Sequence, residues 1–398
     1  MSKDAKNVPA LRFKGYSDAW EKRKLGELAE FINGRAYKQD ELLASGKYSV
    51  LRVGNFYTND KWYYSNLELP EKYYAEEGDL LYTWSATFGP HIWIGPKVIY
   101  HYHIWKVALK NIFEKDFALQ FFEADRVRLL NSTNGSTMIH VTKKDMESKG
   151  ILLPDVYEQR TIGDLLKRVD HLIAATQHKI DALEQAKKAL LQRLFDQSWR
   201  FKGYSDPWEK RKLGELMKVT SVKRVHQSDW RQEGVPFLRA RDIVAINKNQ
   251  KVKEPIYISR DLYERYSEQS GRVTPGDLLV TGVGSIGIPF LIKTESPIYF
   301  KDGNIIWFQN RTLDPAFFYF QFTGNSIQTY ILSTSGKGTV GTFTIATGKQ
   351  TPIVFPKKTE QKLIGSTMSD LDNLIAATQS RLSSLELLKK ALLQDLFI

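Results

Sequence analysis

The stretch RFKGYSDAWEKRKLGEL, residues 12–28, occurs a second time as RFKGYSDPWEKRKLGEL at residues 200–216. Sixteen of the seventeen positions are identical. A second block, residues 158–195, likewise returns at residues 360–397. Repetition on this scale indicates a duplicated architecture, in which one chain builds two similar units.

The two segments between the repeated blocks, residues 31–157 and 217–359, differ in length and share only scattered landmarks. One landmark is Leu51-Arg52 in the first segment, which corresponds to Leu238-Arg239 in the second. Short strand patterns bounded by glycine-rich turns, together with a few helical patterns, predict a mixed α/β (α+β) fold for both segments. Because the repeated blocks and landmarks are the same while the rest of each segment differs, we predict that both segments have one shared fold with two different surfaces.

The repeats and the variable segments divide the chain into five predicted parts. The first eleven residues lack a periodic apolar pattern and are expected to form a tail. Within the variable segments, the clearest helical patterns are Phe117–Leu130 and Pro315–Tyr330. The predicted division is a tail at residues 1–11, a first domain at 12–157, a first helix at 158–195, a second domain at 196–359 and a second helix at 360–398.

The second repeated block has a seven-residue apolar period, which is typical of a coiled coil. Each copy can form one helix of 38 residues, about 57 Å long at 1.5 Å per residue. A stripe this narrow needs a partner, and the other copy is the obvious one, although each helix could instead pack on its own domain. The same polar residues interrupt both copies, Thr176 and Lys187 in the first and Thr378 and Lys389 in the second. The predicted coiled-coil seam consists of Ile162, Leu166, Val169, Ile173, Ile180, Leu183, Leu190, Leu194, Ile364, Met368, Leu371, Ile375, Leu382, Leu385, Leu392 and Leu396.

The chain is basic, with 57 Lys and Arg against 45 Asp and Glu and a formal net charge of +12. This balance indicates a polyanionic partner. The charge is uneven, because residues 31–157 carry 15 basic and 15 acidic side chains whereas residues 217–359 carry 19 and 11. The absence of cysteine excludes disulfides, thiolate metal sites and thiol nucleophiles. No apolar run long enough for a membrane span occurs, so we expect an intracellular protein without a membrane partner.

Polar and basic residues on predicted loops and strand ends are candidates for contacts with double-stranded DNA. Arg, Lys, Asn, Gln, Ser and Thr read base edges, and the same cations bind the phosphate backbone. Because residues 31–157 are neutral overall, binding there requires local clusters, to which Arg126 and Arg128 could also contribute. A solvated surface role is the alternative for each residue taken singly. The candidate DNA-binding residues are Asn33, Arg35, Lys38, Arg52, Asn55, Thr83, Ser85, Thr87, Lys143, Lys144, Lys223, Arg224, Arg239, Arg241, Asp242, Thr281, Ser285, Lys337, Thr339 and Thr342.

Three motifs suggest catalysis or ligand binding, but the residues around each of them do not support that function. The glycine pattern at residues 282–287 matches a dinucleotide-binding motif, but residues 288–290 do not begin a helix. His101 and His103 have no neighbouring carboxylate or cysteine to complete a metal site. Asp-Pro-Ala-Phe at residues 314–317 is similar to the catalytic tetrapeptide of amino-methyltransferases, but it does not begin with Asn-Pro-Pro or Asp-Pro-Pro as that tetrapeptide does. The sequence also contains no phosphate-binding Gly-Lys-Ser/Thr loop. We therefore predict no catalytic residue, no metal site and no cofactor in this chain.

The alternation of variable domain and repeated helix, with Trp-Glu-Lys-Arg-Lys-Leu-Gly-Glu at residues 20–27 and 208–215, resembles the specificity subunits of type I restriction-modification enzymes. The resemblance covers nearly the whole chain, from about Arg12 to Phe397. It implies that the two variable domains are target recognition domains, each reading one half of a split DNA sequence. It also implies that the helices form an antiparallel coiled coil, with the halves related by a pseudo-twofold axis, and that this coiled coil fixes the spacer. The implied protein is a non-catalytic subunit for host defence, cytoplasmic and nucleoid-associated in a prokaryote.

The resemblance also implies protein partners. Two modification subunits methylate adenine with S-adenosylmethionine, and in a larger complex restriction subunits use ATP, so both cofactors are expected on partner subunits. Two similar halves can present equivalent surfaces to two identical partners, which makes the repeated opening blocks candidate contacts. A structural joint between domain and helix is the alternative. The candidate partner-binding residues are Phe13, Tyr16, Trp20, Leu25, Phe201, Tyr204, Trp208 and Leu213.

Two other functional classes compete with this interpretation. One is a coiled-coil adaptor without direct DNA readout, and the other is a methyltransferase or nuclease that acts alone. DNA binding that weakens steeply with salt argues against the adaptor, because it reports the release of counterions from phosphates. Methyl transfer by the purified chain without a partner would support the second class.

Overall fold

The computed structural model places the chain in two compact units, each of which contains one variable domain and part of both long helices. Contacts group residues 1–178 with 380–398 as unit 1, and residues 179–379 form unit 2. The helices are therefore divided between the two units, because their apolar faces are continuous with the domain cores. The structure describes residues 7–57, 59–85, 87–132, 141–335 and 341–397.

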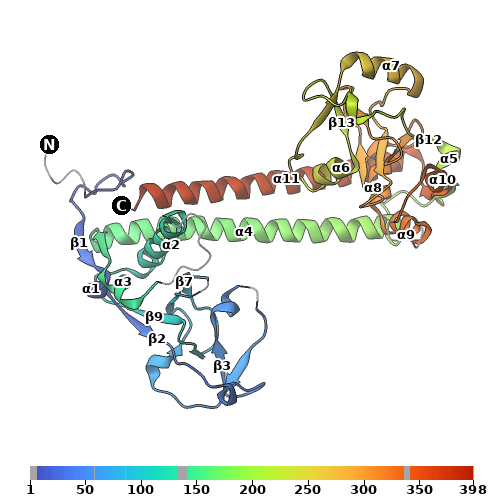
Figure 1. The fold of residues 1–398 in the computed structure, drawn as a ribbon. Coiled ribbons are helices and arrows are strands. Elements are labelled where there is room, and N and C mark those ends of the chain that lie inside the picture. The colour runs from blue at the N-terminus through green and yellow to red at the C-terminus, as the bar shows by residue number, and fades with distance from the viewer. Residues whose placement is uncertain (1–6, 58, 86, 133–140, 336–340, 398) are drawn as a thin grey trace, which may run out of the picture. The chain divides into compact units, whose positions relative to one another are not determined.

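Unit 1 contains two four-stranded sheets and a two-stranded ribbon (Figure 1). The antiparallel sheet β2-β9-β6-β7 packs against α2 through a core that includes Phe31, Tyr82, Trp105 and Phe122. In the second sheet, β4-β3-β8-β5, strands β3 and β8 are parallel. The elements are β1 (Glu21–Lys24), α1 (Leu25–Leu28), β2 (Ala29–Asn33), η2 (Gln39–Glu41), β3 (Tyr48–Leu51), η3 (Val53–Phe56), β4 (Tyr63–Ser65), η4 (Glu71–Tyr73), β5 (Tyr74–Ala75), β6 (Leu80–Thr83), β7 (Gly89–Ile92), β8 (Val98–Tyr100), β9 (Ile104–Leu109), α2 (Lys115–Ser132), α3 (Lys143–Ser148) and β10 (Gly150–Leu153).

Unit 2 repeats this plan with its own core residues. Its antiparallel sheet β12-β18-β15-β16 packs against α8 through Val280, Phe308, Phe318 and Phe322. Its second sheet, β14-β13-β17, again contains one parallel pair, β13 with β17. The elements are β11 (Glu209–Lys212), α5 (Leu213–Leu216), β12 (Lys218–Thr220), η5 (Gln227–Asp229), β13 (Val235–Leu238), α6 (Ala240–Asn247), β14 (Ile256–Ile258), α7 (Arg260–Ser270), β15 (Leu278–Thr281), β16 (Pro289–Leu291), β17 (Tyr299–Phe300), β18 (Ile305–Gln309), α8 (Pro315–Thr323), α9 (Asn325–Thr334), α10 (Ile345–Gln350) and β19 (Pro352–Phe355).

The two domains therefore share a mixed α/β plan, as the landmarks predicted, and differ in detail. The helix predicted over residues 315–330 is wrong as a single element, because it breaks at Gly324 into α8 and α9. Gly324 has an extended backbone, with φ −68° and ψ 154°, which ends one helix and begins the next. The first domain has η3 where the second has α6.

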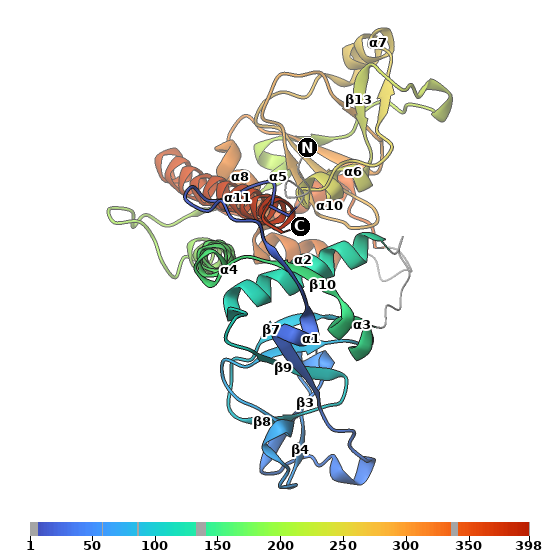
Figure 2. The ribbon, with the colours of Figure 1, turned by 90° about the vertical axis from the view of Figure 1, so that its left-hand side faces the viewer.

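The long helices α4 (Val156–Phe195) and α11 (Lys358–Asp395) pack against each other within each unit (Figures 1 and 2). In unit 1, Ile162 near the start of α4 shares a core with Leu396 at the end of α11. In unit 2, Leu194 at the end of α4 shares a core with Ile364 near the start of α11. This pairing is antiparallel, and the same residues also pack on the variable domains, so both alternatives left open by the sequence occur together. Every predicted seam side chain is buried or half-buried.

The polar seam positions form matching contacts in the two units. In unit 1, Lys389 on α11 pairs with Asp170 on α4 at 2.5 Å. In unit 2, Lys187 on α4 pairs with Asp372 on α11. The duplication makes Lys187 equivalent to Lys389 and Asp170 equivalent to Asp372, so one ion pair is used twice. A charged pair at a defined seam position favours one helix register, because a slip leaves the charges unpartnered.

The repeated opening block closes each domain onto the first turn of the following helix. The Arg12 guanidinium donates to both carboxylate oxygens of Glu158 at 2.7 Å, and Trp20 Nε1 donates to Oε2 of the same carboxylate at 3.2 Å. Arg200 and Glu360 repeat the ion pair in unit 2, at 3.0 and 2.6 Å. These bonds compensate two buried carboxylates for the loss of water.

A glycine near the start of each long helix allows close approach to its domain. A Cβ added at Gly365 would lie 2.6 Å from Asp314 Oδ1 and 2.8 Å from Phe317 N, the two atoms that cap α8. Gly163 faces the same crowding against the backbone nitrogen of Phe117, at 2.9 Å. The sequence alone shows only two glycines in helical patterns, which usually weaken a helix.

We expect Gly365→Ala to lower the free energy of unfolding of unit 2 by about 1–3 kcal/mol. Alanine improves helix propensity by about 1 kcal/mol, but overpacking costs roughly 1–3 kcal/mol and loss of the cap costs about 1 kcal/mol more. Urea unfolding measures the change. The neighbouring Ser366→Ala, on an exposed position, is the control and should change stability by less than about 0.5 kcal/mol. A stabilised Gly365→Ala variant would contradict the close approach.

Candidate nucleic-acid interface

Three of the predicted DNA-binding residues are buried and serve the fold, so these predictions are wrong for direct contact. Thr281 Oγ1 donates to the carbonyl of Ser285 at 2.5 Å and accepts from the amide of Ile288 at 2.9 Å, which braces the β15–β16 hairpin. Thr83 Oγ1 donates to the carbonyl of Gly89 at 3.2 Å and has the same role in the β6–β7 hairpin. Asp242 is buried against Arg239.

The shared Leu-Arg landmark proves to be a capped turn in both domains. The backbone amide of Arg52 donates to Asn55 Oδ1 at 3.0 Å, and the amide of Arg239 donates to Asp242 Oδ2 at 2.8 Å. The Arg239 guanidinium also donates to both Asp242 oxygens, at 2.8 and 2.9 Å, so its charge is neutralised inside the domain. Arg52 lies 4.3 Å from the Tyr63 ring centre instead. The equivalent arginine therefore retains more net charge in the first domain.

The other predicted DNA-binding residues lie on or near the surface. Arg35 is half-buried, pairs with Glu41 at 2.7 Å and lies over the Tyr37 ring. Arg224 is exposed and pairs with Asp302 at 2.9 Å. Ser85 is half-buried. Lys337 and Thr339 lie outside the described residues. The remaining exposed candidates are Asn33, Lys38, Thr87, Lys143, Lys144, Lys223, Arg241, Ser285 and Thr342.

Tertiary contacts bring two loops of the second domain together. The β15–β16 hairpin loop meets the segment before α10, because the amide of Phe343 donates to the carbonyl of Gly282 at 2.9 Å. Exposed Ser285 and Thr342 therefore belong to one surface region, although 57 positions separate them in the chain. The glycine pattern at residues 282–287 is thus a hairpin turn, with Gly284 and Gly287 at positive φ, 68° and 77°.

The first domain presents an aromatic and histidine-rich cluster near its own hairpin. Trp84, the residue that follows β6, lies 5.0 Å from His103 and 6.1 Å from Tyr102 between ring centres. Burial lowers the pKa of His101 to about 4, with smaller contributions from His103 and Arg52. Burial likewise lowers the pKa of His91 to about 4. Burial therefore favours the neutral form of both imidazoles, in which one ring nitrogen donates a hydrogen bond and the other accepts one.

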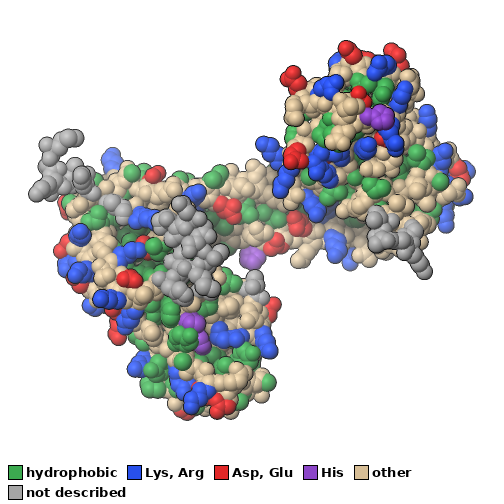
Figure 3. Space-filling view, in the orientation of Figure 1, with side chains coloured by type: hydrophobic (Ala, Val, Ile, Leu, Met, Phe, Trp, Pro, Cys, Tyr) green, Lys and Arg blue, Asp and Glu red, His purple; other side chains and the backbone are tan. Residues whose placement is uncertain are grey.

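The sequence interpretation missed the basic residues that follow α6. Lys248, Lys251 and Lys253 are exposed, and so is Lys293, two residues after the end of β16. Lys and Arg side chains gather over the part of unit 2 that contains α6 (Figure 3). The three lysines within residues 248–253 are visible in the sequence. We did not select them as DNA-binding candidates, because the sequence patterns did not predict the helix α6 that precedes them.

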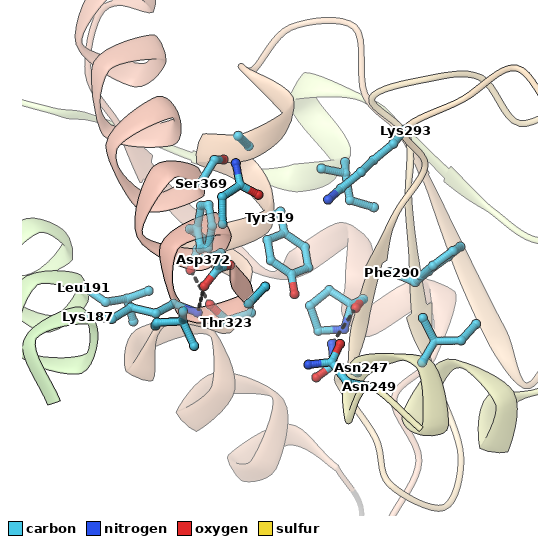
Figure 4. Close-up of a pocket in the computed structure, with 18 of the residues that line it drawn as sticks. Lys187, Leu191, Asn247, Asn249, Phe290, Lys293, Tyr319, Thr323, Ser369 and Asp372 are labelled. Atoms are coloured by element: carbon cyan, nitrogen blue, oxygen red, sulfur yellow. Dashed lines mark hydrogen bonds and ion pairs between the residues drawn. The ribbon is translucent and has the colours of Figure 1, made fainter. Parts of the chain in front are cut away.

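A cavity of about 900 Å³ lies within unit 2 between α6, the β16 hairpin, α8 and the long helices (Figure 4). Its walls combine apolar side chains such as Phe290 and Leu191 with amides such as Asn247 and Asn249. Burial raises the pKa of the Tyr319 phenol at this cavity, and Asp372 contributes in the same direction. Lys187 enters the wall paired with Asp372, whereas Lys293 extends from the opposite side.

The described residues contain neither a metal-binding cluster nor a membrane span. Groups of three or more histidine or carboxylate side chains with metal-binding geometry are absent from that part of the chain. None of its helices combines the length and apolar character that a membrane span needs.

The candidate partner-binding residues divide into two sets. Trp20, Leu25 and Leu213 are buried in the domain cores, so their side chains are not exposed to contact another protein, and their burial is what a structural joint predicts. Phe13, Tyr16, Phe201, Tyr204 and Trp208 are half-buried. On the long helices, Leu172 and its equivalent Leu374 are exposed by 44% and 43%.

Comparisons with known proteins agree with this architecture. The family described as the type I restriction modification DNA specificity domain matches the chain twice, over residues 17–185 and 205–387. The MjaVIII specificity subunit of a type I restriction enzyme from Methanocaldococcus jannaschii is 25% identical, over 94% of this chain and 91% of its own length. The EcoBI specificity subunit from Escherichia coli is 20% identical, over 70% of this chain and 63% of its own length.

The fold is also similar to that of solved structures. The S subunit of a type I restriction-modification system from M. genitalium superposes with a TM-score of 0.62, at 17% identity, over 98% of this chain and 99% of that one. A second structure, described as showing complex assembly and conformational transition of the type I system, gives a TM-score of 0.55 at 16% identity, over 94% and 96%. The two matches to the family model together cover most of the chain. The chain therefore belongs to the DNA specificity subunits of type I restriction-modification systems.

Proposed function

We propose that each variable domain of this specificity subunit reads one half of a split DNA sequence, and that the paired helices set the distance between the halves. The observation that carries the proposal is the duplicated frame. Both domains follow one plan and are joined to their helices by the same Arg–Glu pair, yet their hairpin regions differ, with Trp84, Tyr102 and His103 in one and Ser285 and Thr342 in the other. Equivalent scaffolds with unlike surfaces suit two different half-sites.

The partners follow from the same duplication. The half-buried residues of the opening blocks, together with exposed Leu172 and Leu374, offer equivalent surfaces to two copies of a modification subunit. That subunit supplies S-adenosylmethionine and methylates adenine, while restriction subunits supply ATP hydrolysis in the larger complex. The specificity subunit itself contributes no catalytic group, and it acts at the nucleoid in the cytoplasm of its prokaryotic host.

To test this, the chain is assembled with its modification subunits, and the complex is incubated with host DNA that lacks this methylation. The methylated adenines are then mapped. The expected result is one split sequence with a fixed spacer, bound in a salt-dependent manner. A single continuous sequence would contradict the two-domain assignment. Methylation by the chain alone would favour a self-sufficient enzyme. Assembly without DNA binding at low salt would favour an adaptor.

A further inference from the structure

The two domains diverge sharply after the same capped arginine. In the first domain, eleven residues connect β3 to β4 and include the short helix η3. In the second, seventeen residues connect β13 to β14 and include α6. Both connections begin with an arginine whose amide is capped by the side chain three residues later. Arg52 and Arg239 therefore occupy equivalent positions in the two domains.

The longer connection of the second domain carries unpaired positive charge. Its Arg239 is neutralised by Asp242, and Arg241 contacts Glu254 at 3.2 Å. Lys248, Lys251 and Lys253 remain, all exposed, and none has an ion-pair partner among the residues that the structure describes. By sequence, the corresponding connection of the first domain, residues 52–62, contains one lysine, Lys61, which is exposed and lies beside Asp60.

The domain core holds this basic segment in place. Ile243 of α6 is fully buried with Leu279 and Trp307, so the helix is anchored on the sheet. The end of α6 forms one wall of the cavity, through Asn247 and Asn249, and Lys293 extends from the hairpin on the neighbouring wall (Figure 4). Four exposed lysines of the second domain therefore follow two anchored elements, three of them after α6 and Lys293 after β16.

We propose that the segment from α6 to Lys253, together with Lys293, binds the phosphodiester backbone of DNA, and that the described part of the equivalent connection in the first domain, residues 52–57 and 59–62, has no matching cluster of lysines. This inference rests on the proposed function and adds a division of roles to it. The second domain supplies most of the sequence-independent attraction, whereas the first has equal numbers of acidic and basic side chains over residues 31–157 and presents Trp84, Tyr102 and His103 beside its hairpin. Exposed lysines beside amides suit a polyanionic backbone, because lysine binds phosphate as a mobile point charge.

The test uses the complete complex with its modification subunits and the variant Lys248→Ala/Lys251→Ala/Lys253→Ala. Each phosphate contact contributes about 0.9 to the slope of log affinity against log salt. We expect the slope to fall by about 2–3 and the affinity near physiological salt to fall on the order of 10- to 100-fold. The methylated sequence should be unchanged, since backbone contacts carry no base information.

The matched control is Arg260→Ala/Arg265→Ala/Arg272→Ala, which removes the same charge from exposed positions on and after α7 of the same domain. Glu264 already pairs with two of these arginines, so we expect the salt slope to change by less than about 1. An equal loss in both variants would show an effect of total charge and overturn the proposal. An unchanged slope in the lysine variant would also overturn it.

Two further outcomes distinguish this inference from a protein-docking role of the segment and from failure of the proposed function. If the lysine variant releases the modification subunits while its DNA salt slope is unchanged, the segment is a protein-docking surface and the inference is wrong. If the unaltered complex binds DNA selectively but the lysine variant behaves identically, the inference fails while the proposed function stands. Thermal unfolding of each variant confirms that the second domain is still folded.

Discussion

Exchange of residues 31–157 for the corresponding segment of another recognition domain will change one half of the DNA sequence recognised and leave the other half as it was. The core of unit 1 contains Phe31, Phe117 and Phe122, whereas the core of unit 2 contains Phe308 and Phe317. Because each domain has its own core, a new surface on one does not require repacking of the other. The repeated opening block remains in place and closes the new domain on α4.

The measurement is a map of methylated adenines in DNA modified by the hybrid complex. The reciprocal exchange of residues 217–359 is the matched control and should change the opposite half-site. The spacer should stay constant in both hybrids, because the exchanges replace only the first two residues of α4 and of α11 and leave the length of both helices and all of their seam residues unchanged. A hybrid that changes both half-sites, or the spacer, would show that the domains do not read DNA independently.

Lengthening both long helices by one heptad will shift the preferred spacer to longer DNA. Duplicating residues 180–186 in α4 and 382–388 in α11 preserves the seven-residue seam and adds about 10 Å. At 3.4 Å per base pair this corresponds to about three base pairs. Three base pairs also turn the duplex by about 100°, whereas a heptad leaves helix orientation nearly unchanged, so we expect weaker peak binding at the new spacer.

Binding to duplexes that differ only in spacer length measures the shift. The control inserts the heptad in α4 alone, which moves Leu190 and Leu194 out of register with Ile364 and separates Lys187 from Asp372. That variant should lose stability by several kcal/mol through exposed core residues and an unpaired charge. If the doubly lengthened protein keeps the original spacer, the helices do not set the distance.

Much of the architecture could be predicted from the sequence, because it depends on local patterns and on repeated blocks. The repeated blocks predicted two similar domains, and the heptad period predicted helices at 158–195 and 360–398, close to α4 and α11. The buried or half-buried state of every seam residue follows from that same period. The mixed α/β content followed from strand patterns bounded by turns.

The candidate interface was predicted less well, because the type of a residue does not show whether its side chain is already hydrogen-bonded or ion-paired inside the domain. Thr281 has the chemistry of a base reader, but its hydroxyl is used inside its own hairpin. Asp242 and Arg239 neutralise each other three positions apart. Lys248, Lys251 and Lys253 were not among the candidates, because the sequence patterns did not predict α6, which precedes them and has η3 at the equivalent position of the first domain.

The sequence by itself determined the duplication, the helix period and the family, since these depend on order along the chain. Only the tertiary structure decided which polar groups are available to DNA, which lysine pairs with which aspartate, and that Trp20 and Leu25 belong to a core. The physical reason is that burial and pairing depend on groups far apart in sequence. Arg12 finds Glu158 146 positions away, and no local pattern encodes that contact.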